Sequence, residues 1–424
     1  MTSLFAVAAI VAGCSSTAAT PSPTATATPV PATPTPTATA AASESAAPSA
    51  APSGLSVGSF DASFGAMAQL KSVTSAGSGM VGVILPDVTT SARYTSFDQP
   101  YLTQAFQAAG YSSSDFKIQN ASGTTTTEVA IAQSYIAAGA KVLLVDPLDG
   151  PTGKQIQSLA AAAGIPMISY DRATFQGTKT YYVSFDNVQV GKLIGQGFMD
   201  CVTAWKVASP KVFTLDGGQD TDPNAIDFAK GYNSVVWGQS VAQVADGATN
   251  SAGMTLLHEQ LAPGWNNAQG QTIFQTYFTA HPTVNATIEA NDGLAGAVIT
   301  DLKAAGVKPN TIPTTGQDAT LDGMANILTG WQCGSVYKPI YDEAQAAVAL
   351  ATYLRAGQTP PATLVNGTTT DPTSSATTEP AVLLTPMWVN TANMEATVIK
   401  DKFVSVTDLC NMVTAAVCTQ FGIQ

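Results

Sequence analysis

The chain alternates short, continuous apolar runs with segments of helical periodicity. The first such run is Met80–Leu85, and Lys141–Val145 and Pro166–Tyr170 follow, the last two separated by an Ala-rich helical segment. Later runs are Lys211–Leu215, Met254–Leu257 and Ala286–Glu289. Strands that are apolar throughout and alternate with helices are typical of parallel sheets covered on both faces. About ten strand–helix units exceed what one open sheet usually holds, so we predict an α/β fold of two doubly wound parallel-sheet lobes.

Polar and aromatic residues follow the predicted strands where each strand ends. Arg93 and Tyr94 come after the first run, and Asp171 and Arg172 come directly after Tyr170. The ends of later runs are followed by Asn224, Trp265, Asn291 and Asp318. Ligands of doubly wound sheets bind beyond the carboxyl ends of the strands.

This set of side chains has the chemistry that a sugar requires. Carboxylates accept hydroxyl protons, guanidinium and ammonium groups donate to oxygens, and amides do both. Aromatic rings cover the C–H faces of a sugar ring. Each residue alone also has a structural explanation: Asp171 as a helix cap, Trp265 as a core residue and Arg93 as a surface charge. The combination therefore carries more weight than any single position.

The N-terminus predicts export and anchoring. Leu4–Gly13 is a short apolar run that ends in small residues before Cys14, although no Lys or Arg precedes it. The stretch Val11–Cys14 is similar to a bacterial lipoprotein signal, so we assign residues 1–14 to a signal and expect Cys14 to be lipidated. The alternative is a chance apolar N-terminus. From Ser15 to Ser53 the chain is almost entirely Ala, Thr, Pro and Ser, and we predict that residues 15–77 form a disordered stalk.

Charge and cysteine content narrow the function further. The net charge is −12 and only 11% of residues are charged, which argues against partners such as nucleic acid or anionic lipid. The remaining four cysteines are Cys201, Cys333, Cys410 and Cys418. An even number in an exported protein predicts two disulfides, for which three pairings are possible. With two histidines and no CxxC spacing, the sequence predicts neither a metal site nor a cofactor.

Five segments in order resemble one family, the periplasmic D-xylose-binding proteins, a branch of the type I sugar-binding proteins of ABC importers. These segments are Tyr170–Gly197, Ala262–Gln269, Glu289–Gly306, Thr315–Met324 and Ser335–Ile340. The resemblance extends from about Met80 to Phe403. It implies the type I periplasmic binding protein fold, with three hinge crossings near residues 187, 338 and 378. The lobes would then comprise residues 78–187 plus 338–377 and residues 188–337 plus 378–424.

The resemblance also implies which residues bind the sugar. They are Arg93, Tyr94, Asp171, Arg172, Asn224, Trp265, Asn291, Asp318 and Lys338. Tyr94 stands where the family carries Trp, which puts the sugar preference in doubt. Because buried charges are costly unless they are paired, we expect Asp–Arg and Asp–Lys pairs that are shared with the sugar.

The sequence thus predicts a monomeric extracellular lipoprotein that binds a monosaccharide, xylose or a similar sugar, between two closing lobes and delivers it to an ABC permease. It would lie on the outer face of the cell membrane, or in the periplasm. Glucose, arabinose or galactose are alternative ligands, and a sugar sensor that engages a membrane receptor or kinase is an alternative role. A glycoside hydrolase that uses Asp171 and Asp318 is disfavoured, because neighbouring cations would keep both carboxylates ionised. A repressor would need a helix-turn-helix where the stalk lies.

Overall fold

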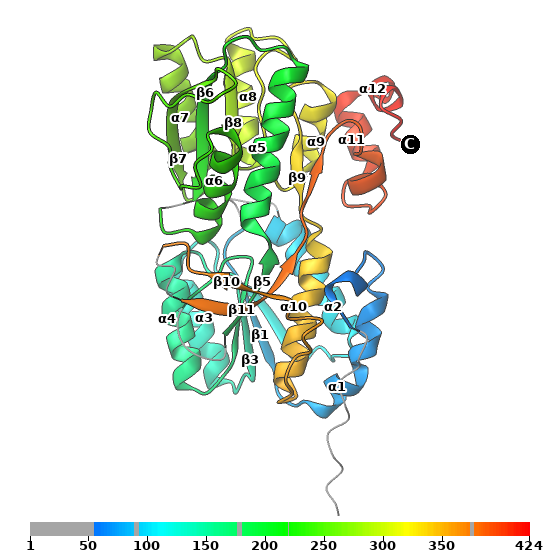
Figure 1. Ribbon diagram of the computed structural model, residues 1–424. Helices are drawn as coiled ribbons and strands as arrows, with labels where there is room; N and C mark the ends of the chain where they lie inside the picture. The colour runs from blue at the N-terminus through cyan, green and yellow to red at the C-terminus, as the bar shows by residue number, and fades with distance from the viewer. Residues whose placement is uncertain (1–54, 89–92, 176–179, 219, 374–376) are drawn as a thin grey trace, which may run out of the picture. The chain divides into compact units, whose positions relative to one another are not determined.

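Two parallel sheets organise the protein, as the computed structural model shows for residues 55–88, 93–175, 180–218, 220–373 and 377–424 (Figure 1). In this described part of the chain, the larger sheet has seven strands in the order β10-β11-β5-β4-β3-β1-β2. Its strands are β1 Val81–Leu85, β2 Phe116–Asn120, β3 Val142–Val145, β4 Met167–Tyr170, β5 Thr180–Phe185, β10 Gly367–Thr370 and β11 Thr378–Leu384. All neighbouring strands are parallel except β10 and β11, which form an antiparallel edge.

Helices cover both faces of this sheet, which is why its central strands are apolar throughout. Val83 and Leu85 of β1 belong to the core shared with α2 (Gln99–Ala108) and α10 (Ile340–Arg355). Ile84, between them, belongs to the opposite core with α3 (Thr125–Ala137) and α4 (Gly150–Ala162). Successive side chains of a strand point to opposite faces, so a strand covered on both sides buries every residue. We call this sheet and its helices the first lobe.

The second lobe repeats this arrangement around a smaller sheet. Its described strands are β7 Thr255–Pro263, β6 Lys211–Gly218 and β8 Ala286–Glu289, parallel and in that order. Helices α5 (Asn187–Ala204) and α6 (Pro223–Val236) share one core with it, and α7 (Asn267–Ala280) and α8 (Asp292–Ala304) share the other. Helix α9 (Leu321–Leu328) and the antiparallel pair β9 (Ser335–Tyr337) and β12 (Met387–Val389) complete it. The predicted fold class is confirmed.

The chain passes between the lobes at three short connections. These join β5 to α5, β9 to α10 and β11 to β12. Strand β11 pairs with β5, so residues 378–384 belong to the first lobe, and the expected lobe boundary at 378 is wrong for this strand. The third crossing therefore follows β11 instead of preceding it.

Residues 55–77 are folded, which corrects the stalk prediction for this segment. The segment forms η1 (Val57–Ser59), η2 (Gly65–Leu70) and α1 (Lys71–Ala76), and Leu55, Met67 and Leu70 are completely buried. The Gln345 side chain donates to the Asp61 carbonyl over 2.8 Å. The low-complexity composition ends at Ser53, and the apolar residues after it join the core of the first lobe. Residues 1–54, including Cys14 and the expected signal, lie outside the described residues.

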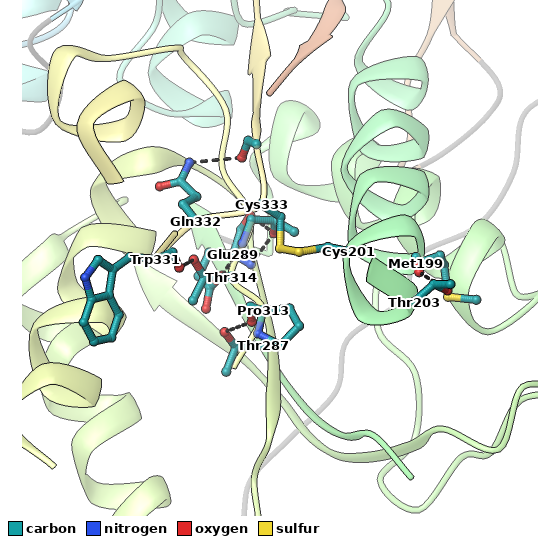
Figure 2. Close-up of a disulfide and its surroundings, with 12 residues drawn as sticks. Met199, Cys201, Thr203, Thr287, Glu289, Pro313, Thr314, Trp331, Gln332 and Cys333 are labelled. Carbon is teal, nitrogen blue, oxygen red and sulfur yellow. Dashed lines mark hydrogen bonds between the residues drawn. A yellow bond between two sulfur atoms is a disulfide. The ribbon is translucent and has the colours of Figure 1, made fainter. Parts of the chain in front are cut away.

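Two disulfides join the four described cysteines, as predicted. One links Cys201 near the end of α5 to Cys333 just before β9, with 5.8 Å between the Cα atoms (Figure 2). The Cys333 amide also donates to the Thr314 carbonyl. The other links Cys410 of α11 (Val406–Val413) to Cys418 of α12 (Ala415–Gln420).

The C-terminal segment contacts both lobes. Helix α11 packs against α9, and the Phe403 ring stacks on Phe97 of the first lobe, with the ring centroids 4.2 Å apart. Among the described residues, no helix has the length and apolarity to cross a membrane.

The two disulfides should differ in how much they stabilise the fold, because they close loops of very different length. The Cys201–Cys333 link spans 132 residues and the Cys410–Cys418 link spans 8. Loop-closure entropy then predicts a loss of about 5 kcal/mol for the Cys201→Ser/Cys333→Ser variant and about 2.5 kcal/mol for Cys410→Ser/Cys418→Ser. Urea unfolding of the full chain measures both free energies. Equal losses, or the reverse order, would contradict the prediction.

Candidate functional site

One cavity between the lobes brings the predicted site residues together. The surrounding atoms leave about 390 Å³ of empty space, part of which is open to solvent. All nine residues expected to bind the sugar line it, and Phe228 and Gln317 line it as well. The full lining is Arg93, Tyr94, Asp171, Arg172, Asn224, Phe228, Trp265, Asn291, Gln317, Asp318 and Lys338.

Arg93 is the centre of the first-lobe wall. It directly precedes η3 (Tyr94–Asp98) and is buried. Its Nε and Nη2 atoms each donate to Asp98 over 2.9 Å, and its Nη1 atom donates to Asp171 over 2.7 Å. Nη2 also donates to Glu343 of α10 over 2.8 Å, and Tyr170 donates its hydroxyl proton to Asp98. The guanidinium is therefore held in one orientation by three carboxylates.

Asp171 is an ionised acceptor at the base of the cavity. Burial would raise the pKa of its carboxyl, but the charges of Arg93, Lys338 and Arg172 outweigh this and hold the pKa well below its ordinary value. The backbone carbonyl of Asp171 accepts hydrogen bonds from the Tyr182 hydroxyl and from the Asn224 amide of the second lobe. The carboxylate is thus fixed, charged and directed to a point that both lobes reach.

Arg172 and Tyr94 form the adjoining part of this wall. The Arg172 guanidinium donates to Asp146 over 3.1 Å and lies 3.5 Å from Asp222 of the second lobe. The Tyr94 ring lies 5.9 Å from the Arg172 guanidinium and 5.6 Å from that of Arg93, within cation–π distance. Burial raises the pKa of the Tyr94 hydroxyl well above its ordinary value, so this group stays neutral.

Trp265 supplies the aromatic face of the second lobe. It follows β7, and its Nε1 donates to Asp222 over 2.9 Å. A Cβ atom at Gly217 would lie 1.9 Å from the indole, so only glycine leaves room for the ring at the end of β6. The Phe228 ring meets the indole edge to face, with the centroids 6.1 Å apart. The indole is partly exposed and lines the cavity, so it is not simply a core residue.

Two asparagines enter the cavity from helix N-termini. Asn224 lies in the first turn of α6, where its side-chain oxygen accepts from Asn187 over 2.8 Å. Asn291 is the N-cap of α8, and its oxygen accepts from the Leu294 amide over 2.9 Å. An N-cap needs only the oxygen of the amide, so the nitrogen of Asn291 stays available as a donor. Structural and binding roles are therefore compatible at this position.

Lys338 and Asp318 provide groups that a ligand can still pair with. The Lys338 ammonium lies 3.6 Å from Asp171 and 3.7 Å from Asp318, close enough for ion pairs but not for hydrogen bonds. Within the described part of the chain, Asp318 Oδ1 and Gln317 Oε1 are buried acceptors without a hydrogen-bond partner. Leaving a buried acceptor unpaired costs about 1–3 kcal/mol. The cavity therefore favours a ligand that brings hydroxyl donors.

Three of the lining residues have left-handed backbone conformations. The φ angles are 59° at Asp171, 59° at Trp265 and 96° at Asp318. Such conformations cost non-glycine residues about 1–3 kcal/mol each and cluster at functional sites. Each of the three follows a strand or bridge at the edge facing the cavity, where the turn redirects the side chain.

Sequence reasoning missed two lining residues, Phe228 and Gln317, and the carboxylates behind the cations. Asp146 directly follows β3, so the strand-end rule that identified Asp171 also applies to it. Asp222 lies two residues before Asn224 in the same motif. The described residues include no group of three or more His, Cys, Asp or Glu side chains that is arranged to hold a metal ion.

Comparisons with known proteins identify the family. Residues 81–359 match the family described as periplasmic binding protein domain. The D-xylose-binding periplasmic protein of Escherichia coli K12 is 32% identical over 289 residues, which cover 68% of this chain and 80% of that protein. The multiple sugar-binding periplasmic receptor ChvE of Rhizobium radiobacter is 29% identical over 76% of this chain and 90% of the receptor.

Solved structures share the fold. An ABC transporter solute-binding protein from Clostridium phytofermentans, with bound β-D-glucose, superposes with a TM-score of 0.65 at 24% identity. The match covers 78% of this chain and 99% of that protein. The predicted type I architecture is confirmed.

Replacing Asp171 by Asn should destabilise the protein equally at pH 7 and pH 5, and the destabilisation should begin to fall only below about pH 4. The variant keeps the shape and tolerates the left-handed backbone, but it removes one partner from a buried ion network, for which we expect a loss of about 3 kcal/mol at pH 7. A carboxyl whose pKa is depressed by folding stabilises the protein fully above its unfolded pKa of about 3.9, and this stabilisation is lost progressively as the pH falls from that value towards the lower pKa of the folded state. Urea unfolding at pH 7, 5 and 3.5 measures the difference from wild type.

Asp186→Asn is the matched control for this experiment. Asp186 is exposed and caps α5, a role that Asn fulfils equally well, so this variant should stay within about 0.5 kcal/mol of wild type at each pH. A destabilisation by Asp171→Asn that grows towards acid pH would show that the carboxylate is not held ionised.

Proposed function

The chain belongs to the periplasmic binding protein domain family, and we propose that it is an extracellular solute-binding protein that binds a monosaccharide and delivers it to an ABC importer. The family identification covers most of the folded part. The relatives are named as binding proteins and receptors, and the chain is not an enzyme. Asp171 supports this conclusion, since its lowered pKa makes it unsuitable as a general acid.

One observation carries the proposal: side chains from distant strand ends and helix N-termini line one cavity with the chemistry of a sugar site. Asp171 and Asp318 offer carboxylate acceptors, and Asn224 and Asn291 offer amides. Aromatic rings at Trp265, Tyr94 and Phe228 supply flat apolar faces for the C–H groups of a sugar ring. The unpaired acceptors at Asp318 and Gln317 would receive protons from sugar hydroxyls.

Binding would couple to closure because the site is divided between the lobes. Arg93, Asp171 and Arg172 belong to the first lobe, whereas Trp265 and Asp318 belong to the second. A ligand favours the closed arrangement only to the extent that it contacts both lobes at once. The pairs Arg172–Asp222 and Lys338–Asp318 join the same two walls and would support that arrangement.

We propose xylose or a close relative as the sugar. The support is the 32% identity to a protein named for D-xylose and the resemblance of the motifs around Asp171 and Asp318. Relatives named for several sugars, and a structural neighbour with bound glucose, keep glucose, arabinose and galactose as alternatives. Tyr94 gives a smaller ring surface than the Trp that the resemblance leads us to expect at this position.

We also propose that the protein acts as a monomer and that a lipid on Cys14 holds it at the outer face of the cell membrane. The support is the apolar run that ends at Cys14 and the Pro-rich sequence that follows it. Such a sequence suits a tether because it cannot bury enough apolar surface to fold.

The sugar proposal predicts a thermal shift. A ligand that binds only the folded state at 100 times its Kd stabilises it by about 2.7 kcal/mol, which corresponds to a rise in Tm of roughly 5 °C for a protein of this size. Differential scanning fluorimetry of the full chain with xylose, glucose, arabinose and galactose measures the rise. Sucrose at the same concentration is the control for general solute effects. If none of a wide panel of monosaccharides raises Tm above the sucrose control, the proposed function is wrong.

Trp265→Ala should abolish this sugar-dependent shift while the variant still unfolds cooperatively, because the indole supplies the aromatic face of the cavity and is only partly buried. Trp205→Ala, which truncates a partly buried indole at the end of α5 and outside the cavity, is the matched control and should keep the shift. A full shift in Trp265→Ala would remove this residue from the site.

A further inference from the structure

Every described cation of the cavity is already paired with more than one carboxylate. Arg93 contacts three: Asp98 at 2.9 Å, Asp171 at 2.7 Å and Glu343 at 2.8 Å. Of these, only Asp171 lines the cavity. Asp98 and Glu343 lie behind the guanidinium and are completely buried.

The other two cations follow the same pattern. Arg172 lies 3.1 Å from Asp146 and 3.5 Å from Asp222, and neither carboxylate lines the cavity. Lys338 lies between Asp171 at 3.6 Å and Asp318 at 3.7 Å. The positive charges are therefore offset by the protein itself, while their N–H groups can still donate to neutral oxygens.

The balance of charge around the cavity is negative. Within the described residues, the six carboxyl groups named above surround three cations. Burial raises the pKa of Glu343 to about 8 and that of Asp146 above its ordinary value. Even with protons on these two, four carboxylates face three cations. An anionic ligand would lose its hydration and meet no unpaired positive charge, which is strongly unfavourable.

We infer that the site selects uncharged sugars and rejects sugar acids, and that two carboxylates outside the cavity lining, Asp98 beside Arg93 and Asp222 beside Arg172, set this selectivity. They act on the ligand through the cations that they neutralise. The inference rests on the proposed sugar-binding function and adds to it the charge class of the ligand and the residues that determine this class.

A series of ligands with one ring tests the inference on the full chain. D-Xylose, D-glucose, D-glucuronamide and D-glucuronate share their ring hydroxyls and differ only at C5, where the amide and the carboxylate have nearly the same shape. Isothermal titration calorimetry at pH 7 should give a Kd for glucuronamide within about 10-fold of glucose, and a Kd for glucuronate at least about 100-fold weaker than the amide. If the galactose ring binds instead, galacturonamide and galacturonate replace the pair. Binding of the acid as tightly as its amide overturns the inference.

Competition by a small anion tests the same inference without depending on the size of the C5 group. Titrations of the neutral sugar are repeated in sodium acetate and in sodium chloride at the same ionic strength. Acetate should raise the Kd of the sugar no more than chloride does. Competition by acetate beyond the chloride control would overturn the inference. Failure of the proposed function gives a different result, because then no uncharged monosaccharide binds at all, and the inference falls with it.

Removing one neutralising charge should relax the selectivity. Asp222→Asn keeps an oxygen that can cap α6 but takes a negative charge from beside Arg172, so the ratio of glucuronate to glucuronamide affinity should rise at least about 10-fold. Because Asp222 also accepts from Trp265, Asp98→Asn provides a second variant, which takes a negative charge from beside Arg93. Asp227→Asn, on the same helix beside Lys230 and outside this cavity, should leave the ratio unchanged. An unchanged ratio in both test variants would show that these carboxylates do not set the selectivity.

Discussion

The buried Arg93 guanidinium is the interaction on which the site depends. A charge without water is tolerated only with partners that satisfy it, and Arg93 draws these partners from three distant parts of the chain. Asp98 comes from the same turn, Asp171 from the end of β4, and Glu343 from α10, some 250 residues away in sequence. The network therefore fixes Arg93 and the start of η3 relative to the sheet and to α10, the helix that follows the second crossing. Lys338 reaches Asp171 from the start of that helix and extends the network to the other lobe.

Much of the fold and of the cavity could be predicted from the sequence because both follow from strand ends. A buried parallel strand is a continuous apolar run, and the polar residue after it must lie at the carboxyl edge of the sheet. Asp171, Asn291 and Asp318 were found in this way. The role of Glu343 could not be predicted from the sequence, because a carboxylate in the first turn of a helix is usually solvated or interacts favourably with the helix dipole. Only the three-dimensional proximity to Arg93 gives it a different role.

Segment boundaries were harder to predict because composition and packing change at different residues. The Pro-rich composition stops at Ser53, yet no periodic helix or strand pattern follows at once, so Leu55 and Met67 looked like part of the stalk until the structure placed them in the core. Strand β11 was assigned to the wrong lobe because the resemblance places the third crossing near residue 378, before this strand, whereas the chain crosses after it. Backbone conformation was equally hidden: no pattern indicates that Trp265 and Asp318 have positive φ.

The link between Cys201 and Cys333 has a mechanical consequence. It fastens α5, which follows the first crossing, to the segment that leads into β9 and the second crossing, and β9 in turn pairs with β12, which follows the third. All three connections are thus tied together on the second-lobe side. They cannot slide past one another, so any relative motion of the lobes must be a rotation in which the three short connections bend in concert.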